Sequence, residues 1–281
     1  AWAAKGYTLI SLGRHEEAQK CFERALEINP REATSWWGKG RALASLGKDK
    51  EGIICYDRAL EIDPKYADAF VGKGLILISL GRHEEASKCF DKALEINPKY
   101  AAAWSGKGAA LQSLGGYEEA LKCFDRALEI NPRDADALVR KGLTLAIQGK
   151  FGESIKCFDK ALEIDPRDAT AWAAKGKALV ELGKHREAIE CFERALQINQ
   201  RDAETWRIKG VALAIQEKFG EALKCFDRAL EIDPGYAHAW AAKMMALVEL
   251  GKYEEAKKCF RKAVEINPGL RKGLESFLGG G

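Results

Sequence analysis

The amino-acid sequence predicts an all-α protein built as a solenoid, and three observations lead to this prediction. A 34-residue unit repeats in constant register, so that eight cysteines recur at this interval from Cys21 to Cys259. Each unit holds two segments with apolar residues at helical spacing, and glycine or proline separates the segments. A fixed period in this range is typical of stacked two-helix units, which bury a continuous core only when they stack.

The first helix of a unit is clearest in the fourth copy, where we expect it over residues 101–114. Trp104, Gly108 and Leu111 are spaced i, i+4, i+7 and therefore share one face of a helix. Gly115 and Gly116 follow, and glycine ends a helix readily because it adopts the left-handed cap conformation at low cost. A tight turn is therefore expected at this point.

The second helix of the same copy is expected over residues 117–130. Ala120, Phe124 and Ala127 form its inner stripe, and charged residues occupy the remaining positions. The pair Asn131-Pro132 ends the helix, because proline cannot donate the next hydrogen bond and disfavours helix at the residue before it. The small residues of the two helices are expected to meet at the crossing, where the backbones approach closely.

The eight copies resemble the tetratricopeptide repeat, whose pattern is a W–LG–Y–A–F–A–P series over 34 residues. Six copies carry tryptophan at the first position, namely Trp2, Trp36, Trp104, Trp172, Trp206 and Trp240. The resemblance implies a right-handed superhelix, with residues 1–268 forming one array of eight units whose first unit is truncated at its start. It also implies that the first helices line a concave side, which the family uses to hold peptides or protein segments.

Three departures from the pattern carry further expectations. Lysine stands before the glycine throughout, from Lys5 to Lys243, and we expect its stem along the helix junction with its ammonium group in water. A basic rail for an acidic ligand is the alternative. Gln200 replaces a proline and Glu217 a turn glycine, which predicts a longer helix or a softer joint. Met244 replaces a glycine and is expected to push the last helix pair slightly apart.

The two ends of the sequence suggest a piece of a longer array. The chain begins inside the first unit without an initiator methionine, so we expect a fragment or a processed chain. Residues 269–281 are expected to form a capping helix from Arg271 to Leu278, followed by a flexible glycine tail. As an alternative, Leu274, Phe277 and Leu278 act as a ligand segment for a neighbouring molecule.

Composition narrows the class of partner. Lys+Arg 45 against Asp+Glu 42 leaves a net charge of +3, which is too balanced to favour nucleic acid or an anionic membrane surface. No apolar run approaches the ~20 residues that span a bilayer. Equivalent cysteines in stacked repeats lie on the order of 10 Å apart, beyond the reach of a disulfide. Free thiols are therefore expected, and they favour a reducing compartment such as the cytoplasm.

Residue patterns that carry catalysis or metal binding do not occur in the sequence. The four histidines are scattered, and there is neither an H-x3-H nor a C-x2-C pair. Glu-Glu pairs fall in the first turns of helices, where they complement the helix dipole. Gly-x-Gly stretches lie inside helices and not on strand-to-helix turns, so no phosphate-binding loop is expected. We expect no enzyme activity, no metal and no cofactor.

The variable positions of the first helices predict a peptide-binding groove, because the packing positions stay constant while these change. The groove residues are Trp37, Arg41, Val71, Leu75, Ile78, Val139, Arg140, Leu143, Ile147, Lys177, Arg207 and Val211. Apolar patches interrupted by charges of both signs suit an amphipathic segment. The other interpretation is that neighbouring first helices shield much of this apolar area. The family's carboxylate-clamp positions hold other residue types here, which argues against ligands of that kind.

The sequence thus predicts a non-catalytic protein-protein interaction scaffold that binds a peptide or protein segment in its concave groove. A structural, self-assembling module is the alternative, in which end-to-end stacking gives a homo-oligomer or a filament. An engineered array made from a natural one is a further alternative.

Overall fold

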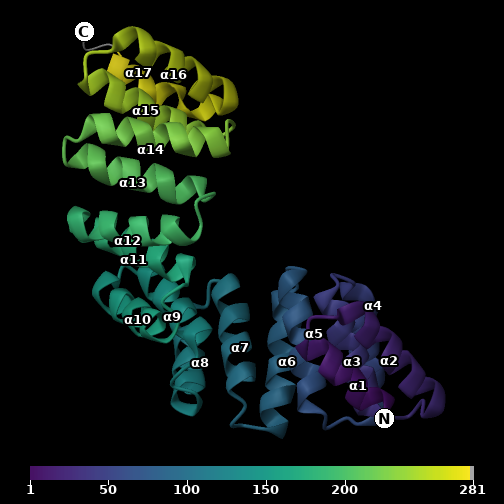
Figure 1. Cartoon of the computed structure of the whole chain (residues 1–281). Coiled ribbons are helices and arrows are strands. Elements are labelled where there is room, and N and C mark those ends of the chain that lie inside the picture. The colour runs from purple at the N-terminus through teal and green to yellow at the C-terminus, as the bar shows by residue number, and fades with distance from the viewer. Residues whose placement is uncertain (279–281) are drawn as a thin grey trace. The chain divides into compact units, whose positions relative to one another are not determined.

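A computed structural model describes residues 1–278, which form seventeen α-helices and one short 3-10 helix (Figure 1). The first helices of the units are α1 (Trp2–Ser11), α3 (Ala33–Ser45), α5 (Ala67–Ser79), α7 (Ala101–Ser113), α9 (Ala135–Ile147), α11 (Ala169–Glu181), α13 (Ala203–Ile215) and α15 (Ala237–Glu249). The second helices are α2 (His15–Ile28), α4 (Asp49–Ile62), α6 (His83–Ile96), α8 (Tyr117–Ile130), α10 (Phe151–Ile164), α12 (His185–Ile198), α14 (Phe219–Ile232) and α16 (Tyr253–Ile266). The chain then continues through η1 (Pro268–Leu270) into α17 (Arg271–Leu278).

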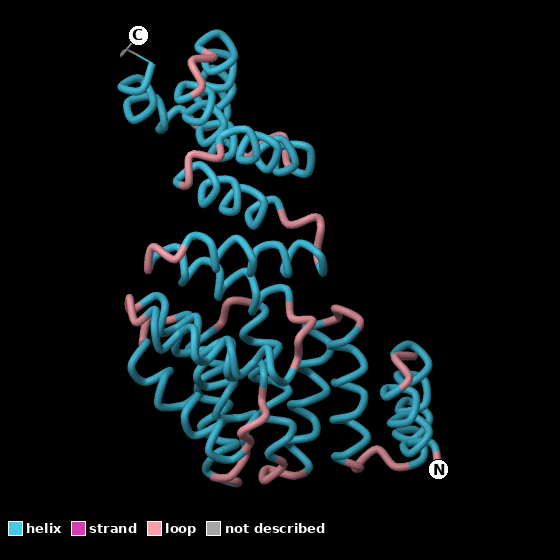
Figure 2. The backbone as a smooth tube through the Cα atoms, turned by 60° about the vertical axis from the view of Figure 1, so that its left-hand side comes forward, coloured by secondary structure: helices cyan, strands magenta, loops and turns pink. Residues whose placement is uncertain are grey.

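Residues 1–278 contain no strand, and consecutive helices pack as pairs joined by short loops (Figure 2). The predicted all-α solenoid of helix-turn-helix units is therefore confirmed. The chain divides into two compact units, unit 1 from Ala1 to Thr144 and unit 2 from Leu145 onward, and each is described by itself. The expected glycine tail lies outside the described residues. No helix within residues 1–278 is long and apolar enough to cross a membrane.

The turn inside each unit depends on one residue in the left-handed region. Gly115 has φ +81°, and the amide of Gly116 donates to the carbonyl of Leu111 at 2.9 Å, which caps α7. Six other units use glycine in the same way, and unit seven uses Glu217 at φ 61°. The turn keeps its bonds there, since Lys218 donates to the carbonyl of Leu213 at 3.0 Å.

In five repeats, a tryptophan in the first turn of the first helix ties the helix to the turn between units. Trp104 Nε1 donates to the carbonyl of Pro98 at 2.9 Å and so ties α7 to the preceding loop. Trp206 forms the same bond at 3.1 Å, although Gln200 replaces the proline. Because this bond and the side chain of Asn199 hold the turn, α12 ends at Ile198 like its equivalents. The longer helix predicted at this joint is wrong.

The aromatic ring of each second helix fills the space between two first helices. Phe124 is fully buried, and a Cβ placed on Gly108 would lie 2.7 Å from its ring. Phe90 meets glycines on both sides, because added Cβ atoms on Gly74 and Gly106 would lie 2.8 and 2.4 Å from it. The Gly-Lys-Gly stretches of unit 1 are therefore packing features that let first helices approach the ring.

Met244 changes this arrangement in the last repeat. The side chain of Met244 is fully buried, whereas Phe260 is only partly buried, unlike the equivalent rings of the other phenylalanine-bearing repeats. Methionine therefore fills the core where a ring does so elsewhere, and the ring moves toward the surface. The expected separation of the last two helices stays a prediction.

The lysines before the glycine join successive repeats. Seven of them form ion pairs of 2.5 to 3.1 Å with a carboxylate on the second helix of the preceding repeat: Lys39–Glu23, Lys73–Asp57, Lys107–Asp91, Lys141–Asp125, Lys175–Asp159, Lys209–Glu193 and Lys243–Asp227. Several also lie 5.4 to 5.8 Å from the centre of a tryptophan ring on their own helix. The expected position along the helix junction is confirmed. The basic rail is wrong, because these charges are already neutralised within the fold.

The cysteines lie against the helix junctions as small apolar groups. Cys89 is partly exposed, and its seven equivalents are buried. Cys55 and Cys191 form no disulfide, and burial raises the pKa of each thiol to about 11. Because a neutral thiol is a weak nucleophile, these side chains serve packing and not chemistry.

Candidate peptide-binding surface

Within each unit, the first helices form the inner layer. In unit 1, α1, α3, α5 and α7 contact one another in succession, and in unit 2, α11, α13, α15 and α17 do the same. The described parts of the second helices make no such contacts with one another within a unit. In a curved stack of helix pairs, the helices of the concave layer lie closer to one another than those of the convex layer. The exposed side chains of the first helices therefore form the inner face of each unit, and α17 adds to that of unit 2.

The predicted groove residues differ in how far they reach this surface. Val71 and Val139 are 5% and 6% exposed, so the shielding interpretation holds for them. Leu75 and Ile147 are 53% and 58% exposed and do offer apolar area. The side chain of Arg41 is exposed, and half-buried side chains occupy the remaining predicted positions, namely Trp37, Ile78, Arg140, Leu143, Lys177, Arg207 and Val211.

Most charged residues of the inner faces are engaged with neighbours. Arg140 Nε donates to Asp136 at 2.7 Å, and Lys177 Nζ donates to Glu204 at 2.9 Å. Arg207 donates to the hydroxyl of Tyr236 at 2.8 Å. A ligand charge would have to compete with these bonds, so the exposed apolar side chains are the more available part of these faces.

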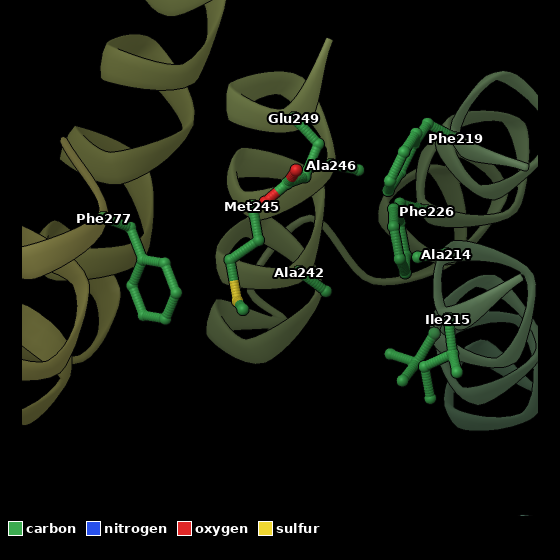
Figure 3. Close-up of a pocket in the computed structure, with 10 residues that line it drawn as sticks. Ala214, Ile215, Phe219, Phe226, Ala242, Met245, Ala246, Glu249 and Phe277 are labelled. Carbon is green, nitrogen blue, oxygen red and sulfur yellow. The ribbon is translucent and has the colours of Figure 1, made fainter. Parts of the chain in front are cut away.

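Unit 2 contains an apolar pocket of about 330 Å³ on its inner face. Figure 3 shows Met245 of α15 between Phe277 of α17 and side chains of α13 and α14. The lining residues are Val211, Ala214, Ile215, Phe219, Phe226, Ala242, Met245, Ala246, Glu249 and Phe277. Glu249 is the one charged side chain among them. The pocket has the size of a small ligand site and suits a large apolar side chain.

One wall of this pocket is formed by α17, and another includes Ile215 of α13. Leu274 is only 7% exposed and packs in a core cluster with Met244 and Leu247, so α17 lies against the last repeat and brings Phe277 to the rim. This burial argues against the alternative in which Leu274 engages a neighbouring molecule. Ile215 was missed in the prediction, although its repeat position holds serine in the first four units and a large residue in later ones.

Unit 1 carries an aromatic surface. The ring centroids of Tyr7 and Trp37 are 5.9 Å apart, and those of Trp37 and Tyr66 are 6.0 Å apart. The hydroxyl of Tyr7 donates to the carbonyl of Thr34 at 2.6 Å, which holds this ring in place. Burial raises the pKa of Tyr66, so its hydroxyl stays protonated. We call Tyr7, Trp37 and Tyr66 the aromatic surface.

Metal-ligating groups do not gather in the described residues, where no cluster of three or more histidine, cysteine or acidic side chains could hold an ion. The expectations of no cofactor and no enzyme activity stay predictions.

Tetratricopeptide-repeat models match the sequence over nearly its whole length. The matched segments are residues 3–67, 67–100, 101–134, 133–201, 173–237 and 213–272. The chain belongs to the tetratricopeptide repeat family. Tetratricopeptide repeats are in general scaffolds for protein interaction, and this broad class applies here.

Solved structures of other tetratricopeptide repeat proteins resemble the chain. YrrB, described as a protein "with an unusual peptide-binding site", is 27% identical, with a TM-score of 0.53 over 70% of this chain and 97% of its own. PilF of Pseudomonas aeruginosa is 20% identical, with a TM-score of 0.67 over 75% and 96%. A protein from Parabacteroides merdae is also 20% identical, with a TM-score of 0.63 over 88% and 97%. The latter two support the fold alone. No curated protein matches the sequence.

Proposed function

We propose that the chain binds a peptide or protein segment on the inner faces of its repeats, as a cytoplasmic scaffold without catalytic activity. The observation that carries this proposal is the apolar pocket of unit 2, where Met245 is 40% and Phe277 45% exposed. Large apolar side chains around a concavity of this kind are typical of a site for an anchor residue. The peptide-binding site of YrrB supports the same class of ligand.

The predicted groove residues have different roles in this proposal. Val211 lines the pocket, and Leu75 and Ile147 offer exposed apolar area. Lys177 and Arg207 are bonded within the wall and would form a polar rim that orients the ligand. Val71 and Val139 are buried, so they would contribute to the packing of the first helices and not to ligand contact. Within the described residues, no observation of comparable weight favours end-to-end self-assembly.

The test is selection from a displayed peptide library on the full chain, with Met245→Glu as the counter-screen. A carboxylate in the apolar pocket would be poorly solvated, so we expect selected peptides to carry a large apolar residue and to bind at least about tenfold more weakly to this variant. Met245 is preferable to Leu143 because Leu143 is half-buried, and a glutamate there also tests folding.

Ile266→Glu is the matched control, because Ile266 is also 40% exposed but lies on the second helix α16. We expect the control to bind within about twofold of the parent chain, since exposed surface changes are usually within about 0.5 kcal/mol. Circular dichroism of both variants confirms that helicity is kept. Equal loss of binding in the two variants, or none in either, would remove the pocket from the proposal.

A further inference from the structure

Two of the three rings of the aromatic surface, Tyr7 and Trp37, stand outside the repeat pattern, whereas tyrosine recurs at the position of Tyr66 as Tyr100 and Tyr236. At the repeat position of Trp37 the other copies carry small, β-branched or charged residues, namely Ala3, Val71, Ser105, Val139, Ala173, Arg207 and Ala241. At the repeat position of Tyr7 no other copy carries an aromatic residue. Six repeats carry neither ring, so packing of the repeat does not require Tyr7 or Trp37.

The three rings are held in place from behind. Tyr7 meets the buried ring of Phe22 edge-on at 5.0 Å between centroids, and Trp37 and Tyr66 pack on the core cluster that contains Tyr56. Each of the three surface rings is nevertheless only partly buried. The aromatic surface is therefore a strip of three supported rings, from α1 across α3 to the start of α5, and we refer to it below as the strip.

Hydrogen-bond donors on this strip remain unused. Five tryptophans at the first repeat position donate their indole N–H to a loop carbonyl, namely Trp36, Trp104, Trp172, Trp206 and Trp240. Trp37 does not, and the hydroxyl of Tyr66 also has no acceptor within residues 1–278. Half-buried indole and phenol donors normally find a partner, so the strip is suited to a ligand that brings acceptors.

Charged groups of both signs lie around the strip, namely Arg41, Glu32 and Asp68. The guanidinium of Arg41 lies 5.6 Å from the centre of the Trp37 ring and forms no ion pair among the described residues. The nearby carboxylate of Asp68 already accepts from the hydroxyl of Tyr100. The carboxylate of Glu32 likewise accepts from the hydroxyl of Ser35. Arg41 has no such side-chain partner among the described residues, so an acidic ligand residue can pair with it beside Trp37.

We propose that this strip binds a proline-containing segment in the polyproline II conformation, with an acidic residue next to the prolines. Such a segment has no internal hydrogen bonds, so its carbonyls are free to accept from Trp37 and Tyr66. Its proline rings pack on aromatic faces, and its rise of about 3.1 Å per residue lets about four residues cover the three rings. An α-helical ligand fits less well, because its carbonyls are bonded within the helix.

The inference rests on the proposed function only in that a segment binds an inner face, and it concerns a site made of other residues than the pocket of unit 2. The test is fluorescence anisotropy on the full chain with a labelled peptide of about eight residues that holds four prolines, two leucines and a glutamate. A second peptide has alanine in place of each proline. We expect the alanine peptide to bind at least about tenfold more weakly, because it loses ring contacts and the preformed conformation.

Substitutions of Trp37 test whether the proline peptide binds at the strip. Trp37→Ala is expected to weaken binding of the proline peptide about tenfold, and Trp37→Phe, which keeps a ring and removes the N–H donor, about fivefold. Ile54→Ala, an exposed side chain on α4, is the control and is expected to bind as the parent chain does. Unchanged helicity in circular dichroism confirms that each variant folds.

The outcomes separate the two proposals. If the proline peptide does not bind, while library peptides bind in a manner that depends on Met245, the inference about proline is overturned and the proposed function stands. Binding of the proline peptide that is insensitive to both Trp37 variants overturns the assignment to the aromatic strip. If neither library peptides nor the proline peptide bind, both proposals fail.

Discussion

Units 1 and 2 share one scaffold but present different chemistry on their inner faces. Unit 1 offers a strip of three aromatic rings with unused donors, whereas unit 2 offers an aliphatic pocket bounded by Met245 and Phe277. Behind both faces the second-helix aromatics are buried, except for Phe260, and the lysine ion pairs recur. The difference shows that inner-face positions without a packing role vary widely, while junction positions change little and, as with Met244 and Phe260, with a rearrangement of the core.

The strongest test of this separation between scaffold and inner face is to truncate one buried second-helix ring in each unit. Phe124→Ala and Phe192→Ala should each lower the free energy of unfolding by about 3–5 kcal/mol, because both rings are fully buried and leave a cavity. Trp37→Ala and Met245→Ala on the inner faces should cost clearly less. Urea denaturation followed by circular dichroism measures all four, and a loss at Trp37 as large as that at Phe124 would contradict the separation of scaffold from ligand face.

A smaller effect is expected from placing the methionine of the last repeat, Met244, at the equivalent glycine of the repeat before it. Gly210→Met should lower the free energy of unfolding by about 1–3 kcal/mol, because a Cβ there would lie 2.5 Å from the ring of Phe226 and force it out. The same denaturation experiment measures it. Adding Phe226→Ala to Gly210→Met should cost much less than Phe226→Ala alone, since methionine then fills the space; additive costs would show that Met244 and Phe260 are not a compensating pair.

Unit 2 holds one strained turn that unit 1 lacks. Glu217→Gly should raise the free energy of unfolding by about 1 kcal/mol, because Glu217 has φ 61° where other units use glycine. Glu190→Gly, at an exposed position inside α12, is the matched control and should lower it by about 1 kcal/mol. A decrease for Glu217→Gly would mean that its side chain contributes more than the backbone strain costs.

The smallest effect at neutral pH should come from the thiols, and it should be the same in both units. The pKa of Cys55 and of Cys191 is raised to about 11, so at pH 8 each should react with iodoacetamide at least about tenfold more slowly than free cysteine. A raised pKa favours the neutral thiol of the folded state, so its contribution to stability is present below pH ~9 and is lost as pH rises toward 11. Mass spectrometry of the alkylated peptides measures the rates, and fast labelling of either thiol in folded protein would show that it is not buried.

Much of the fold was predictable because its signals are local. The start and end of α8 follow from Gly116 before it and Pro132 after it, and the observed bounds Tyr117–Ile130 match the expectation. The prediction at Gln200 failed because proline was taken as the cause of the turn. The indole of Trp206, which reaches back six residues, and the side chain of Asn199 hold the turn without it.

The candidate site was predictable only in part, because exposure depends on neighbouring helices. Trp37 and Val71 occupy the same repeat position, yet the first is partly exposed and the second is buried. Ile215 and Phe277 line the same pocket because of the packing of α17, which no repeat position indicates. These side chains lie far apart in the sequence, so their position around one pocket is a property of the packed layers.

The sequence by itself determined the period, the helix bounds and the residues at each junction, because caps, breakers and small residues act over a few positions. The tertiary structure decided which lysines are neutralised, which tryptophan keeps a free N–H and where a pocket opens. These outcomes depend on side chains of successive repeats reaching one another, as when Lys73 crosses to Asp57 while Trp37 finds no acceptor.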